Sequence, residues 1–208
     1  MADDLLTQLA SHRLVPVVVL DDAGDAAGLA EALVAGGLPV AEVTFRTSAA
    51  AEAIAVMARR GDVLVGAGTV RTVQQVDEAV AAGAGYIVSP GLGESVVRRC
   101  QEIGIPVLPG AVTATEVMRA AELGLSTVKF FPAATSGGAA AIKALSAPFG
   151  DMKFVPTGGI GPKNIAEYLA LDCVSAIGGS WMVPQAMVRA RQFDDIAQLT
   201  RDAVALVK

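Results

Sequence analysis

Lys129 is the residue of this chain most able to do chemistry, because it is the lone cation of the apolar segment 127–132. If that segment is a strand, the two-residue period places Thr127, Lys129 and Phe131 on one face. An ammonium is costly to keep charged among aromatic and aliphatic groups, so burial favours the neutral amine. A neutral amine can attack a ketone and form a Schiff base. The alternative is a side chain at a strand end that reaches into water.

A carboxylate and a guanidinium follow the same alternating pattern in segment 41–47. The period places Glu42, Thr44 and Arg46 on one face. If this face shares a cavity with Lys129, Glu42 can transfer protons and Arg46 can bind a carboxylate or phosphate through two parallel hydrogen bonds. A purely structural pair of Glu42 and Arg46 is the alternative.

Two further segments could contribute to the same cavity. Glycines in segment 66–69 let the backbone approach a ligand, and Thr69 can hydrogen-bond a small carboxylate. Pro90 would shape a pocket wall, with a plain turn as the alternative.

Glycine pairs end the last two apolar segments, at Gly158-Gly159 and at Gly178-Gly179, where Ser180 follows. Backbone N–H groups in such turns bind phosphate in many barrels, at these same two places. Tight turns without a ligand are the alternative.

Eight short apolar segments recur along the chain, and helix-like segments rich in alanine lie between them. Strands are expected at 15–20, 40–44, 63–66, 86–89, 106–108, 127–131, 154–157 and 174–178. Strand alternating with helix eight times predicts an α/β fold, a (β/α)₈ TIM barrel with functional groups at the carboxyl ends of its strands. An open doubly wound sheet is the alternative, but a spacing of roughly 25 residues favours the closed barrel, which leaves no edge strand.

Helices are expected over 26–35, 49–60 and 73–82, where Ala-rich segments end at glycines. An extra N-terminal helix is expected over 4–10, at the bottom of the barrel. No linker or low-complexity segment interrupts the chain, so residues 1–208 are predicted to form a single domain.

Composition and charge exclude several classes of protein. Hydrophobic residues make up 53% and charged residues 18%, which argues against disorder, and the net charge of −5 argues against nucleic-acid or anionic-membrane surfaces. The absence of a long apolar run and the acidic start predict a cytoplasmic protein without a membrane span.

Cys100 and Cys173 are expected to be reduced thiols. With His12 as the one histidine, a zinc site built on several histidines is excluded, and neither metal nor cofactor is expected.

Six segments together resemble the bacterial 2-keto-3-deoxy-6-phosphogluconate (KDPG) aldolases, also described as 2-keto-4-hydroxyglutarate (KHG) aldolases. They occur in the family's order and span nearly the whole chain: 42–47, 66–70, 87–92, 128–133, 156–160 and 177–181.

The resemblance implies a class I aldolase of the Entner–Doudoroff route, usually trimeric and needing no metal, that takes a small 2-keto acid. It implies that Lys129 forms the Schiff base and that Glu42 is the general acid and base. The substrate-binding residues that it implies are Arg46 and Thr69 for the pyruvyl carboxylate, Pro90 and Phe131 as pocket walls, Thr157 near the hydroxylated carbons, and Gly158, Gly159, Gly179 and Ser180 for the phosphate.

One departure from the family concerns the residue after Phe-Phe-Pro-Ala, which is commonly Glu and is Ala134 here. The sequence leaves open a phosphorylated six-carbon acid, its C4 epimer and hydroxyglutarate as substrates. Two other functions also remain: a phosphate-binding isomerase or synthase that uses Glu42 and Lys129 as an acid–base pair, and a non-catalytic phospho-sugar binding protein.

Overall fold

The fold consists of parallel strands with helices between them. A computed structural model describes residues 2–208, with side chains from residue 7 onward. The strands are β1 (Leu14–Val18), β2 (Val40–Thr44), β3 (Leu64–Gly68), β4 (Ile87–Val88), β5 (Val107–Leu108), β6 (Thr127–Phe130), β7 (Lys153–Pro156) and β8 (Ile177–Gly179). The helices are α1 (Ala2–His12), the 3₁₀ turn η1 (Ala23–Asp25), α2 (Ala26–Ala35), α3 (Ala50–Arg60), α4 (Val73–Ala81), α5 (Glu94–Ile103), α6 (Ala114–Glu122), α7 (Gly138–Ser146), α8 (Ile165–Leu169), α9 (Gln185–Arg189) and α10 (Phe193–Ala205).

Six strands form one parallel sheet, in the order β5-β4-β3-β2-β1-β8, which makes a half-barrel. Strands β6 and β7 form a second parallel pair. Isolated bridges join the two groups on both sides: Gly110 with Lys129, Phe154 with Val174, and Thr157 with Gly178. The predicted α/β class with parallel strands is confirmed.

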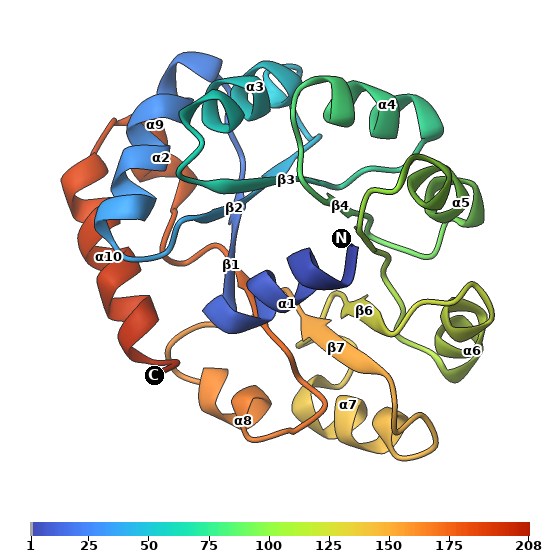
Figure 1. Cartoon of the computed structure of the whole chain (residues 1–208). Coiled ribbons are helices and arrows are strands. Elements are labelled where there is room, and N and C mark those ends of the chain that lie inside the picture. The colour runs from blue at the N-terminus through green and yellow to red at the C-terminus, as the bar shows by residue number, and fades with distance from the viewer. Residues whose placement is uncertain (1) are drawn as a thin grey trace.

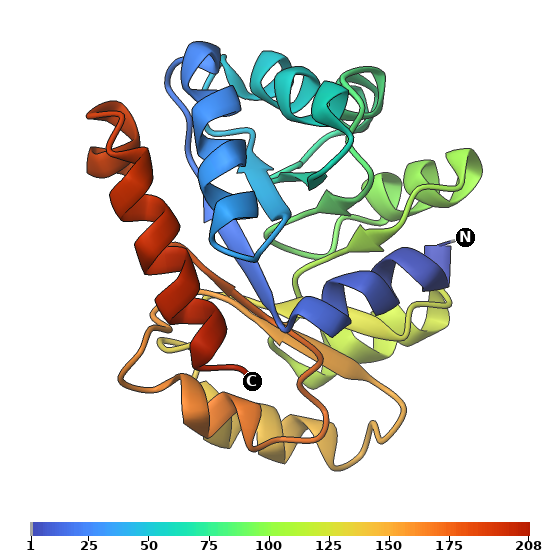
Figure 2. The same ribbon diagram turned by 60° about the vertical axis from the view of Figure 1, so that its left-hand side comes forward.

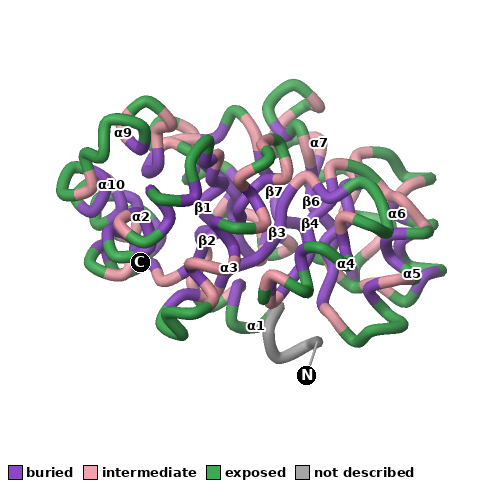
Figure 3. The backbone as a smooth tube through the Cα atoms, turned by 90° about the horizontal axis from the view of Figure 1, so that it is seen from above, coloured by how far each residue is buried: buried purple, intermediate pink, exposed green. Residues whose placement is uncertain are grey.

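The helices surround the strands, so that the core lies between the two layers (Figure 1). Figure 3 shows the strands buried at the centre, whereas exposed segments lie on the helices and loops around them. Helix α10 packs along α2 (Figure 2). Two glycines of the α2 region allow this approach, because a Cβ at Gly28 would collide with the Phe193 ring and one at Gly36 with Thr200.

The N-terminal helix α1 exists and is longer than the predicted 4–10. It crosses the strands at one end of the molecule, as Figure 1 shows. His12 lies in its last turn, where burial lowers the pKa of the imidazole. Within the described chain, no helix is both long and apolar enough to span a membrane.

Only β2 keeps its predicted bounds; the other strands differ from the sequence prediction by one to three residues at one or both ends, and three of them differ most. Strand β1 ends at Val18, short of the expected end at position 20, and β3 runs on through Gly68. The last strand lies at Ile177–Gly179 instead of 174–178. Glycine normally weakens a strand, but it is favoured where another group approaches the backbone closely. Here the missing Cβ atoms of Gly178 and Gly179 leave room for Thr157 and Trp181.

Candidate active site

The structure brings Lys129 and Glu42 together from two separate strands. Lys129 Nζ lies 3.0 Å from Glu42 Oε1 and 3.4 Å from Oε2. The two residues are only 6% and 3% exposed, so the pair is withdrawn from water. The carboxylate therefore lies within hydrogen-bond reach of the amine, the geometry that proton transfer between two groups requires.

Lys129 and Phe131 share one face of the chain, as alternation predicts. Lys129 Nζ lies 5.5 Å from the centroid of the Phe131 ring. Both line an inner pocket of about 250 Å³ at the carboxyl ends of the strands. The other lining residues of the inner pocket are Val17, Arg46, Thr69, Pro90 and Thr157.

A second, outer pocket of about 280 Å³ adjoins the inner one. The two share Val17, Arg46, Phe131 and Thr157. The outer pocket also contains the predicted phosphate-binding residues Gly158, Gly159, Gly179 and Ser180, together with Val19, Ile160, Val183, Pro184 and Gln185. Arg46 is therefore the cation common to both pockets.

Glycines of β3 make room for the carboxylate of Glu42. In the parallel register Glu42 pairs with Gly66, and Thr44 pairs with Gly68. A Cβ at Gly68 would collide with the Glu42 carboxylate. Thr44 donates its hydroxyl hydrogen to Val18 O over 2.9 Å, so this member of the predicted face joins β2 to β1 and does not line either pocket.

Tyr86 contacts both β2 and β3, a role that the sequence prediction missed. A Cβ at Gly66 would collide with its ring, and its hydroxyl donates to Ala41 O over 2.9 Å. Burial, with a smaller effect of the Glu42 charge, raises the pKa of Tyr86 well above its ordinary value, so it is a neutral donor. The one signal in the sequence was a polar residue at the start of an apolar strand.

Asn164 supports the glycine turn of the outer pocket, another role that the sequence prediction missed. Its Nδ2 donates to Gly159 O over 3.0 Å, and its Oδ1 accepts from the N–H of Gly161 over 2.9 Å. Gly159 has a φ of 73°, in the left-handed region, and a Cβ there would collide with Ala134. The residue that departs from the family pattern therefore lies beside the predicted phosphate turn.

A polar cluster lies at the rim of the outer pocket, between the loop after β1 and helix α9. Gln185 Nε2 donates to Asp21 Oδ2 over 3.0 Å, and Arg189 Nε donates to the same oxygen over 2.7 Å. Hydrogen bonds from Arg189 and then Gln185 lower the pKa of Asp21. No motif in the sequence predicted that these distant segments meet.

The side chains that the structure describes, those of residues 7–208, include no arrangement suited to a metal ion. No group of three or more His, Cys, Asp or Glu residues there lies in an arrangement that could hold a metal ion. Burial raises the pKa of the Cys100 thiol to about 12, so that thiol stays protonated. The charged side chains that line the two pockets are Arg46 and Lys129, and Glu42 is bonded to Lys129.

Comparisons of the sequence point to one family. The sequence profile described as KDPG and KHG aldolase matches residues 5–199. The 2-dehydro-3-deoxy-phosphogluconate aldolase of Treponema pallidum is 50% identical over 196 residues, which cover 94% of this chain and 93% of that protein. The KHG/KDPG aldolase of Escherichia coli K12 is 45% identical over 197 residues, covering 94% and 92% of the two chains.

A solved structure agrees in fold. The KDPG aldolase of Legionella pneumophila, captured with pyruvate as a covalent carbinolamine intermediate, superposes with a TM-score of 0.92 at 40% sequence identity. The match covers 95% of this chain and 97% of that one.

Proposed function

We propose that this chain, which belongs to the KDPG and KHG aldolase family, cleaves 2-keto-3-deoxy-6-phosphogluconate through a Schiff base on Lys129. The products would be pyruvate and glyceraldehyde 3-phosphate. The observation that carries the proposal is the buried pair of Lys129 and Glu42, 3.0 Å apart beside the inner pocket. An amine held next to a proton acceptor is the arrangement that imine formation requires.

Imine formation begins when Glu42 takes a proton from the Lys129 ammonium. The neutral amine attacks the C2 ketone, and the ketone oxygen takes that proton to become the hydroxyl of a carbinolamine. Glu42 then accepts a proton from the nitrogen and returns it to the hydroxyl, which leaves as water. The product is a protonated imine between Lys129 and C2, and Glu42 is a carboxylate again.

Carbon–carbon cleavage uses the same two groups. Glu42, directly or through water, takes the proton of the C4 hydroxyl while the C3–C4 bond breaks. The electron pair of that bond moves into the protonated imine, which leaves an enamine and frees the aldehyde. Return of a proton to C3 and hydrolysis of the imine then release pyruvate and regenerate Lys129. One carboxylate serves as base and acid in turn because the proton that it accepts is the one that it later donates.

The two pockets divide the substrate between them in this proposal. Arg46 and Thr69 of the inner pocket bind the pyruvyl carboxylate, with Pro90, Phe131 and Thr157 around the carbon chain. In the outer pocket, the glycine turns and Ser180 hold the phosphate. A shorter 4-hydroxy-2-oxoglutarate, which would give pyruvate and glyoxylate, needs the inner pocket alone.

The eight strands, we infer, close into one (β/α)₈ barrel domain. The isolated bridges between the two groups of strands support closure, since they place a neighbour on each side of every strand. A trimer and a cytoplasmic location stay predictions of the sequence.

Reductive trapping tests the function directly. Pyruvate and borohydride are added to the protein, and the intact mass and the modified peptide are measured. We expect a reduced pyruvyl adduct on Lys129. No adduct on folded protein would instead favour the isomerase or synthase that uses Lys129 and Glu42 without a covalent intermediate. Release of pyruvate from KDPG separates the enzyme from a silent phospho-sugar binding protein.

A further inference from the structure

We propose that Gln185 is a specificity-determining residue for the phosphorylated end of the substrate, and that Asp21 and Arg189 are its positioning residues. Gln185 is the first residue of α9 and lines the outer pocket together with Ser180 and the glycine turns. This inference rests on the proposed function and deepens it, because it assigns the substrate preference of the same site.

The hydrogen bond to Asp21 fixes how Gln185 is oriented. A carboxylate accepts hydrogen bonds only, so the side-chain nitrogen must face Asp21, as the 3.0 Å contact has it. In the described part of the chain, the amide oxygen of Gln185 has no hydrogen-bond donor. That oxygen is therefore free to accept from the hydroxyl of the sugar acid next to the phosphate, a donor that hydroxyglutarate lacks.

Charge balance at the rim depends on Arg189. The side chains of Asp21 and Arg189 are 44% and 62% exposed, and their Nε···Oδ2 distance is 2.7 Å. In physiological salt, charges still interact over a Debye length of about 8 Å. Asp21 bonds a residue that lines the pocket, so without a cation beside it this carboxylate would repel a bound phosphate. The guanidinium of Arg189 cancels that repulsion.

A separate contact holds the same two loops together. Arg191 Nε donates to Asp25 Oδ1 over 2.7 Å, and Asp25 is only 7% exposed. Asp21, Gln185 and Arg189 take no part in this contact, so we expect it to persist when they are changed. Their effects on the substrate can therefore be measured in a protein whose rim is still assembled.

Three variants test the proposal against the phosphorylated substrate KDPG and the unphosphorylated hydroxyglutarate. Gln185→Ala should raise KM for KDPG about two- to tenfold, the effect of one lost hydrogen bond, with kcat unchanged. Arg189→Ala should raise the same KM because it leaves Asp21 unbalanced. Asp21→Asn should lower it, because asparagine still accepts from Gln185 while the negative charge is gone. High salt should shrink the last two effects, and KM for hydroxyglutarate should not move.

Arg98→Ala is the matched control. Arg98 is 59% exposed, bonds a glutamate that is 41% exposed, and lies on α5, across the ring of helices from α9 (Figure 1). It should leave both KM values unchanged. If the rim were purely structural, Asp21→Asn and Arg189→Ala would both raise KM for both substrates, and that result would overturn the inference. An unchanged KM for KDPG in Gln185→Ala would also overturn it. Failure of the proposed function looks different: the unmodified protein would neither trap pyruvate nor cleave KDPG.

Discussion

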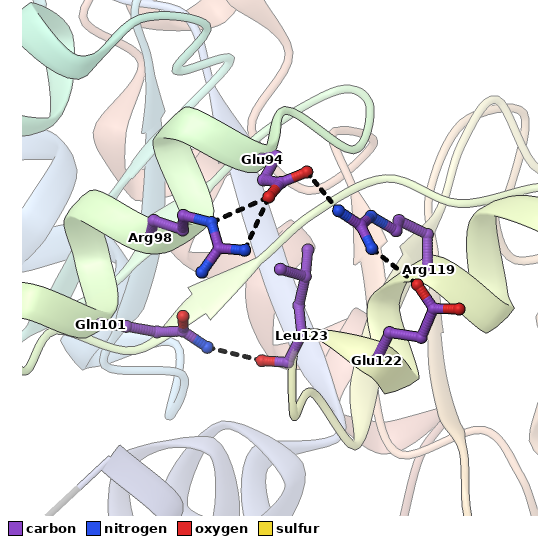
Figure 4. A network of polar contacts seen from close by, with 6 residues as sticks. All are labelled: Glu94, Arg98, Gln101, Arg119, Glu122 and Leu123. Carbon is purple, nitrogen blue, oxygen red and sulfur yellow. Dashed lines mark hydrogen bonds and ion pairs between the residues drawn. The ribbon is translucent and has the colours of Figure 1, made fainter.

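Two sets of ion pairs in this molecule differ in their access to water. The pair of Lys129 and Glu42 lies inside the strands, with side chains 8% and 4% exposed. The other set joins α5 to α6 on the surface, where Glu94 accepts from both Arg98 and Arg119, and Arg119 also binds Glu122 (Figure 4). These surface side chains are between 41% and 59% exposed.

Distance alone would rank the strengths of the two sets of ion pairs wrongly. The surface pairs of Arg119 are 2.6 Å long, shorter than the 3.0 Å of the buried pair. Water screens the surface charges, so such pairs stabilise a protein little. The buried pair of Lys129 and Glu42 is almost withdrawn from water, so each charge depends on the other as its hydrogen-bond partner. Proton transfer from Lys129 to Glu42 would leave the neutral amine that the proposed reaction needs as its nucleophile.

The surface network has a different role, which is to join neighbouring helices. Besides the ion pairs, Gln101 Nε2 donates to Leu123 O over 2.7 Å (Figure 4). A further pair, Arg99 with Asp77, joins α5 to α4. None of these side chains lines either pocket.

Removing the cation from each set should give the largest contrast. Lys129→Ala removes the proposed nucleophile, and we expect kcat to fall by at least about 10³-fold. Arg119→Ala removes the central cation of the surface network and should leave kcat within about twofold. Steady-state pyruvate release measures both, with circular dichroism to show that both variants are folded. Near-normal turnover in Lys129→Ala would remove it from the mechanism.

The next largest change in kcat is expected when the carboxylate of each set is neutralised. Glu42→Gln keeps the size of the side chain but cannot transfer the proton, so kcat should fall about 10²- to 10⁴-fold. Borohydride should still trap some pyruvate on Lys129, more slowly. Glu94→Gln serves as the matched control and should cleave KDPG at the normal rate. Equal rates in the two variants would mean that another group carries the proton.

Crowding the buried pair should have a smaller effect. A Cβ at Gly68 collides with the Glu42 carboxylate, so Gly68→Ala must displace it. We expect a loss of about 1–3 kcal/mol in stability from overpacking, and a fall in kcat of up to about 10²-fold from the misplaced carboxylate. Gly150→Ala is the control, because a Cβ there meets open space. Denaturant unfolding and kcat are measured together; an unaffected kcat would show that the position of Glu42 is not critical.

The buried pair was within reach of sequence reasoning because the pattern that places it is local. Alternation within one strand places Lys129 and Phe131 on one face, and alternation within another directs Glu42 inward. Parallel strands then bring their carboxyl ends to one edge. A short-range period and a fold rule were enough to place these side chains on faces that could share a cavity, and the structure shows that they do meet.

The supporting contacts were out of reach because each joins segments that are far apart in the chain. Tyr86 packs on Gly66, and Gln185 bonds Asp21 from the opposite end of the sequence. Such contacts depend on strand register and loop path, which no local period encodes. The role of Gly68 in β3 was missed for the same reason, since Glu42, the residue that needs the space beside it, belongs to a different strand.

The smallest expected effect lies in the surface network and its dependence on pH. Hydrogen bonds from Arg119 and then Arg98 lower the pKa of Glu94 below its ordinary value. The network therefore stabilises the fold above the ordinary glutamate value of about 4.3, and this contribution is lost as the pH falls through the lowered value. Glu94→Gln should lower Tm by no more than about 2 °C at pH 7, and the difference should vanish once the pH is below the lowered pKa of Glu94. Glu31→Gln, an exposed glutamate of α2 that forms no ion pair in the described chain, is the control. A larger loss, or one that persists at low pH, would mean that the surface pairs are less screened than their exposure implies.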